Sequence, residues 1–144
     1  MKMTPTHIII HCSDTEDSGT VSWQAIRRYH VEYRGWSEIG YHAGIELIGK
    51  RFETLLGRMF DEQGAHCRFG GFNSHSIGIC CVGKFDSRKP PGGQLKQAQR
   101  LCRWLMDRYH IPVENVLGHG EIDKGKTCPG RMFDMYQFRK DLED

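Results

Sequence analysis

Three side chains that commonly bind metals stand at the ends of short apolar segments or in the loops beyond them. His11 ends an apolar run, His119 follows a second short one, and Cys128 comes nine positions after His119. Two imidazoles and one thiolate are good ligands for Zn²⁺, and three protein ligands leave a fourth tetrahedral position for water. Zinc lowers the pKa of water in that position to about 7. These residue types therefore predict a catalytic rather than a structural zinc site.

Composition by itself leaves a simpler interpretation open, because the chain contains eight histidines. His11 could be a hydrogen-bonded core residue, and Cys128 could be a small buried apolar one. Cys12 also competes with His11 for the role of ligand. Adjacent residues of a strand point to opposite faces, so at most one of these two side chains is expected to face the site.

The first part of the chain predicts a buried strand followed by a helix. Residues 7–12 (HIIIHC) form a short apolar strand. A helix is expected to follow, capped by Thr20 or Ser22 and continuing to Tyr33. Four residues would form the apolar face of this helix: Ile26, Tyr29, His30 and Tyr33.

The middle of the chain predicts a hairpin and a central strand. Residues 41–48 alternate as a strand, Gly49 and Lys50 form a turn, and residues 51–55 could pair back. Residues 64–74 are rich in glycine and are expected to form a loop. Residues 76–82 (SIGICCV) are apolar throughout, which is typical of a central strand covered on both faces.

The last third predicts two helices and one strand. Apolar residues recur at helical spacing over residues 94–109, and Pro112 ends that helix. A short strand over 114–118, a loop over 121–130 and an amphipathic helix over 131–142 complete the chain. We therefore expect an α/β (α+β) fold in one domain, residues 1–144, with a mixed central sheet flanked by about three helices.

Charge and hydropathy restrict the classes of partner. The net charge of +2 is too small for a dedicated nucleic-acid-binding protein. No segment approaches the roughly 20 apolar residues that span a membrane, and the first residues do not form a secretory signal. We expect synthesis in the cytoplasm without a signal peptide, no membrane insertion, a monomer, and six reduced cysteines.

Several segments, in order along the chain, resemble the motifs of the N-acetylmuramoyl-L-alanine amidase family, which includes amidase-type phage lysozymes and peptidoglycan recognition proteins. The resemblance covers about residues 7–138. The segments that carry it are 11–15 (HCSDT), 26–30 (IRRYH), 35–42 (GWSEIGYH), 74–83 (SHSIGICCVG), 118–121 (GHGE) and 126–130 (KTCPG).

This resemblance implies a fold, a reaction and roles for particular residues. The fold would be that of peptidoglycan recognition proteins, with zinc bound by His11, His119 and Cys128. The reaction would be hydrolysis of the amide bond between N-acetylmuramic acid and L-alanine in peptidoglycan. Tyr41 and Lys126 match catalytic positions of the family, where they could stabilise an oxyanion, and Tyr41 or a water could protonate the leaving amine.

Other polar and aromatic residues have two interpretations each. His66 could line a groove for the sugar or be a simple exposed histidine. Trp36 could stack on a sugar or pack in the core. Glu121 could hydrogen-bond an imidazole ligand or be a surface carboxylate, and His42 is expected to be structural.

Three alternatives to a phage or prophage endolysin stay open. The same chemistry would suit a cytosolic amidase that recycles soluble muropeptides. A peptidoglycan-binding module without catalysis, or a regulator with a purely structural zinc, would use the fold differently. An endolysin would act on the cell wall only after its release from the cytoplasm.

Overall fold

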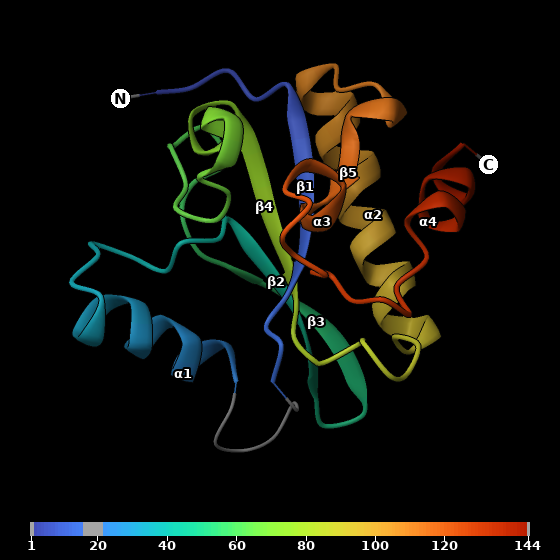
Figure 1. Cartoon of the computed structure of the whole chain (residues 1–144), viewed down its shortest axis with the longest axis horizontal. Coiled ribbons are helices and arrows are strands. Elements are labelled where there is room, and N and C mark those ends of the chain that lie inside the picture. Colours follow the sequence, from blue (N-terminus) through green and yellow to red (C-terminus); the bar gives the residue numbers. More distant parts are fainter. Residues whose placement is uncertain (1, 16–21, 144) are drawn as a thin grey trace.

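A five-stranded sheet of mixed direction forms the centre of the protein (Figure 1). The computed structural model describes residues 2–15 and 22–143; Thr20, one of the two expected helix caps, lies outside them. The strands are β1 (His7–Cys12), β2 (Ala43–Ile48), β3 (Arg51–Leu56), β4 (Ser76–Cys81) and β5 (Val116–Gly118), in the order β3-β2-β4-β1-β5. Only the β2–β3 pair among them is antiparallel, so the expected mixed α/β fold is confirmed.

Burial on both faces explains the apolar composition of the two central strands. β1 pairs in parallel with β4 on one side and with β5 on the other. Every residue of β4 is buried, and so are the five residues of β1 after His7. A parallel strand that is covered on both faces is apolar over most of its length. Both strands lie inside the sheet, which explains their composition.

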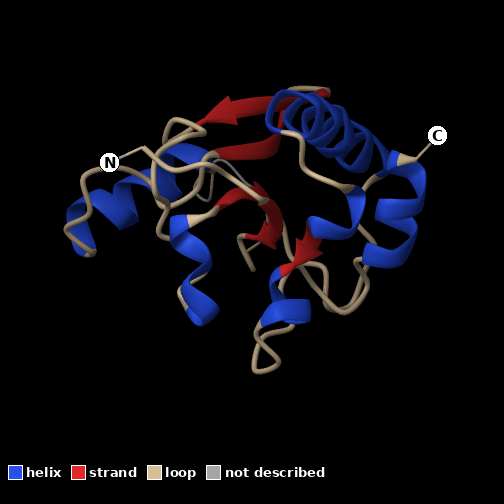
Figure 2. Cartoon of the chain, turned by 90° about the horizontal axis from the view of Figure 1, so that it is seen from above, coloured by secondary structure: helices blue, strands red, loops and turns tan. Residues whose placement is uncertain are grey.

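Helices cover the sheet from opposite sides. α2 (Gly92–Tyr109) and α4 (Met135–Leu142) lie together on one side, and α1 (Trp23–Arg28) lies away from them (Figure 2). Three short helices, η2 (Phe69–Ser74), η3 (Val113–Asn115) and α3 (His119–Ile122), and a π-helical turn, η1 (Tyr29–Tyr33), complete the described elements.

The alternation of side chains along β1 assigns each residue to a face. Ile8, Ile10 and Cys12 pack into the large apolar core beneath α2 and α4. Because neighbouring residues of a strand point in opposite directions, His11 projects to the other face. Cys80 and Cys81 divide in the same way, since Cys81 joins the α2 side and Cys80 packs with Trp23 on the face that carries His11.

The expected apolar face of the first helix is wrong at two positions. Tyr29 is 51% exposed and Tyr33 is 80% exposed, whereas Trp23 is the buried residue of this region. The helix widens at Tyr29, where the Arg34 N–H donates to the Tyr29 carbonyl five residues earlier. The wider turn rotates the following side chains out of the α-helical register, and the simple helical period therefore fails here.

The last helix begins four residues later than expected. The N–H of Arg131 donates to Asp86 Oδ1 and that of Met132 donates to the Phe85 carbonyl, so these groups are bonded to another loop. Asp134 then caps the helix by accepting the N–H of Gln137 at 3.0 Å. The loop expected over residues 121–130 begins two residues later, because α3 extends to Ile122.

Two further expectations concern the whole chain. All six cysteines are free thiols, as predicted. Within residues 2–15 and 22–143, no helix combines the length and the apolar character that crossing a membrane requires.

The Gly44→Ala variant is expected to lose about 1–3 kcal/mol of unfolding free energy, the usual cost of overpacking. A Cβ at Gly44 would lie 2.3 Å from the Trp23 ring, and the Trp23 indole N–H is bonded to the Leu56 carbonyl. Urea unfolding measures the change. Gly92→Ala is the matched control, because no atom lies within 4 Å of the added Cβ; equal stability of the two variants would contradict the packing argument.

Candidate metal centre

His11 reaches the candidate centre from the end of β1 and is almost fully buried. Its ring lies 4.7 Å from the His119 ring and 5.2 Å from the Tyr41 ring, measured between centroids. Burial, followed by the nearby imidazoles, holds the pKa of His11 well below its usual value. His11 is therefore neutral at physiological pH, and a neutral imidazole is the form that binds a metal.

His119 is the first residue of α3, directly after β5. Its position is set by Gly118, whose N–H donates to Glu121 Oε1 at 2.8 Å, and by Arg139, which binds both oxygens of the same carboxylate. Glu121 therefore holds the start of α3 rather than an imidazole. Burial lowers the pKa of His119, so this side chain is also neutral.

Cys128 comes from the loop after α3, which folds back against that helix. The N–H of Gly120 donates to the Cys128 carbonyl at 2.6 Å, and a Cβ at Gly120 would lie 2.6 Å from the Lys126 carbonyl oxygen. The backbone N–H of Cys12 donates to Cys128 Sγ at 3.2 Å. The Cys12 side chain packs in the core on the α2 side with its thiol against Cys128, so of these two neighbours it is His11 whose ring meets His119.

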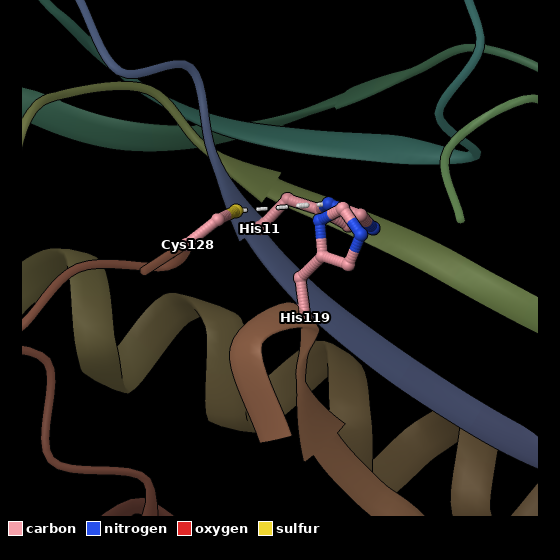
Figure 3. A group of neighbouring side chains, drawn as sticks. All are labelled: His11, His119 and Cys128. Atoms are coloured by element: carbon pink, nitrogen blue, oxygen red, sulfur yellow. Dashed lines mark hydrogen bonds between the residues drawn. The ribbon is translucent and has the colours of Figure 1, made fainter. Parts of the chain in front are cut away.

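The three side chains converge although they are far apart in the sequence (Figure 3). One ligand atom from each of His11, His119 and Cys128 lies within 4.8 Å of the other two. His11 Nδ1 is 3.7 Å from Cys128 Sγ, and tetrahedral zinc with bonds of about 2.0–2.3 Å separates its ligands by about 3.5 Å. The expected trio therefore converges into a group that could hold a metal ion.

The electrostatics of Cys128 also suit a cation. The hydrogen bond with the Cys12 thiol, and then burial, raise the pKa of Cys128 far above its usual value. A thiol in such surroundings becomes a thiolate only when a positive charge lies beside it. A divalent ion between two neutral imidazoles and this sulfur would supply that charge, so the donor set fits zinc.

Tyr41 and Lys126 both lie beside the trio. The Tyr41 ring contacts His11, and burial raises its pKa well above the usual value, so the phenol keeps its proton at neutral pH. Lys126 is exposed on the Cys128 loop, and its charge adds to the burial that lowers the pKa of His119. A neutral phenol and an ammonium group are both hydrogen-bond donors, as oxyanion stabilisation requires.

Two cavities meet at Lys126. The first, here called the His119 groove, has a volume of about 480 Å³ and is lined by His66, Trp36, Arg34, Phe69, His119 and Lys126, among others. The second, called the Cys128 groove, has a volume of about 600 Å³ and is lined by Gly120, Lys126, Cys128, Arg131 and Tyr136, among others. His119 therefore lines one groove, Cys128 lines the other, and Lys126 lines both.

The groove candidates His66 and Trp36 both lie in the His119 groove but are held differently. Trp36 packs against His30, with ring centroids 4.6 Å apart, and beneath the Arg34 guanidinium. His66 is bonded to His11 through its Nδ1 atom at 2.9 Å, and burial lowers its pKa to about 3. Its contact with His11 was not expected, because the glycine-rich segment around it carries no sign of a partner 55 positions away.

Comparisons with known proteins agree on one group. Residues 1–131 match a family model described as N-acetylmuramoyl-L-alanine amidase. The endolysin of Escherichia phage T7 is 36% identical over 129 residues, which cover 85% of this chain and 78% of that protein. Peptidoglycan-recognition protein LB of Drosophila melanogaster is 32% identical over 136 residues, 88% of this chain and 56% of that protein. The structure of N-acetylmuramoyl-L-alanine amidase LysC from Clostridium intestinale URNW matches with a TM-score of 0.84 and 28% identity, covering 98% of this chain and 87% of that one.

Proposed function

This chain belongs to the N-acetylmuramoyl-L-alanine amidase family, and we propose that it hydrolyses the bond between N-acetylmuramic acid and L-alanine in peptidoglycan with the help of zinc. The observation that carries the proposal is the convergence of His11, His119 and Cys128. These two imidazoles and one thiolate would hold the ion, as three protein ligands do in catalytic zinc sites. Bound there, zinc supplies Lewis-acid polarisation and activation of water.

The side chains around the trio have separate tasks. Lys126, at the junction of the two grooves, donates a charge-assisted hydrogen bond to the oxyanion that develops when the lactyl carbonyl is attacked. One such donor contributes about 3 kcal/mol to lowering the barrier. Tyr41 holds a phenolic proton beside His11 and supplies a second donor. Tyr41, or a water next to it, also gives a proton to the leaving L-alanine amine.

The two grooves offer room for the two ends of the substrate. Peptidoglycan has a sugar on one side of the scissile amide and a peptide on the other, and His119 and Cys128 line one groove each. Trp36, in the His119 groove, presents an aromatic ring to a sugar or peptide group. Residues 1–144 form one catalytic domain in this proposal, and the domain acts as a monomer.

Action on the cell wall as an endolysin is the biological role we propose. Relatives from several phages are called endolysins, among them those of Escherichia phage T7 and Klebsiella phage KP32. Such a role requires release of the protein from the cytoplasm to the wall. Rates on intact sacculi and on soluble anhydro-muropeptides separate this role from muropeptide recycling, since a recycling amidase prefers the soluble substrate.

The direct test is digestion of purified peptidoglycan by the recombinant protein. New L-alanine amino termini are expected, with no new sugar reducing ends. Dipicolinate is expected to abolish the reaction, and added Zn²⁺ is expected to restore it, because the chelator removes the ion that the trio holds. Reducing ends in place of amino termini would show that another bond is cut, and full activity without metal would exclude the zinc mechanism.

A further inference from the structure

The nitrogen of His11 that faces away from Cys128 is bonded to a second histidine. His11 Nε2 lies 2.9 Å from His66 Nδ1, and the two rings meet edge-on with centroids 5.0 Å apart. One of these two nitrogens must carry the proton that they share. Which one carries it decides whether the other nitrogen of His11 has a free lone pair for a metal.

The surroundings of His66 decide where its proton lies. His66 Nε2 is 3.3 Å from the carbonyl oxygen of Ser76 and 3.4 Å from the Ser76 hydroxyl. That hydroxyl donates its own proton to the Phe72 carbonyl at 2.6 Å. Both Ser76 oxygens can therefore only accept from His66, so the proton of the neutral His66 ring is on Nε2.

The position of that proton determines the form of His11. With its Nε2 protonated, His66 has a bare Nδ1 that accepts a hydrogen bond from His11 Nε2–H. His11 is then unprotonated at Nδ1, and this is the atom that lies 3.7 Å from Cys128 Sγ. The chain from Ser76 through His66 thus leaves the metal-facing nitrogen of His11 with its lone pair free.

The His66 ring is also fixed in place by its neighbours. Asn73 Oδ1 accepts the backbone N–H groups of His66 and Cys67, each at 2.7 Å. A Cβ at Gly78 would lie 2.4 Å from His66 Cγ, and one at Gly64 would lie 2.5 Å from His66 Cδ2. The ring therefore occupies space that only glycine at both positions leaves open.

We propose that His66 is a positioning residue for the metal centre, which keeps His11 protonated on Nε2 and turns its bare Nδ1 toward the ion. The proposal rests on the proposed function only in taking that ion to be zinc. Histidine ligands commonly donate their second N–H to an oxygen acceptor, and loss of that acceptor typically lowers metal affinity about 10–100-fold. Here the acceptor is another imidazole.

The first test is nuclear magnetic resonance of the zinc-free wild-type protein with ¹⁵N-labelled histidines. The nitrogen shifts distinguish protonated from bare ring nitrogens, and His11 and His66 are both expected to carry their proton on Nε2. A proton on Nδ1 of His11 would overturn the proposal, whatever the behaviour of any variant.

The second test measures zinc affinity by competition with a chelator. His66→Phe keeps a ring of similar size but has no acceptor, so its Kd for Zn²⁺ is expected to rise about 10–100-fold. His66→Gln offers an amide oxygen to His11 Nε2–H and is expected to recover part of the affinity. His75→Phe, a histidine that packs against His7 and Phe72, is the control and is expected to bind zinc as the wild type does.

Wild-type zinc affinity in a folded His66→Phe variant would overturn the proposal, and circular dichroism reports whether the variant folds. If His66→Phe does not fold, two measurements decide. They are the Kd for Zn²⁺ of His66→Gln relative to the wild type and the resonance test. Neither test uses peptidoglycan. An inactive wild-type protein that binds zinc would therefore contradict the proposed function and leave the role of His66 intact.

Discussion

The Cys128→Ser variant is expected to lose bound zinc and to lose amidase activity by at least about 1000-fold, the order seen when a principal catalytic group is removed. A serine hydroxyl is a much weaker zinc ligand than a thiolate, and the remaining trio members, His11 and His119, would hold the ion with two bonds. Metal content per chain and release of L-alanine amino termini measure the two effects. Both should fall together.

Binding to intact peptidoglycan is expected to survive in Cys128→Ser, because the two grooves are lined mainly by other residues. Sedimentation with sacculi measures it. Cys102→Ala is the control, since Cys102 lies on α2 with its side chain buried in the core, and its loss should leave zinc and activity unchanged. Full activity of Cys128→Ser would exclude the thiolate as a ligand.

The Lys126→Ala variant is expected to lose about 100–1000-fold in kcat while keeping its zinc, as is usual when one oxyanion donor is removed. Lys126 lies at the junction of both grooves and close enough to His119 to lower its pKa, but it is not a member of the trio. Its ammonium group is expected to act on the transition state and not on metal binding. Steady-state kinetics and metal content measure the effects separately.

Lys124→Ala is the matched control for Lys126→Ala. It removes one positive charge from the same loop, two positions earlier, and is expected to keep kcat near the wild-type value. Lys126→Arg should recover part of the activity, because a guanidinium also donates to an oxyanion. A rise in KM with unchanged kcat would contradict the role in catalysis and would make Lys126 a binding residue alone.

Much of the fold could be predicted from local patterns. The helical repeat of α2 fits only a helix, and the short continuous apolar runs of β1 and β4 are typical of buried strands. The structure contains all three elements. The patterns gave wrong predictions at two places, the turn at Tyr29 and the start of α4. Tyr29 and Tyr33 are exposed where a π-helical turn begins at Tyr29, and the Phe85–Asp86 segment holds the N–H groups of Arg131 and Met132 outside α4.

The identity of the candidate ligands followed from residue type and from the resemblance of short segments, since imidazole and thiolate chemistry belongs to the side chains themselves. The sequence supports an expectation that these ligands converge but does not show how. The parallel pairing of β1 with β5 produces the convergence, because it brings the end of β1 beside the start of α3. The role of His66 was decided by the tertiary structure alone. Its bond to His11 joins residues 55 positions apart and depends on space left by two glycines, and a hydrogen bond between distant segments leaves no period in the chain that could reveal it.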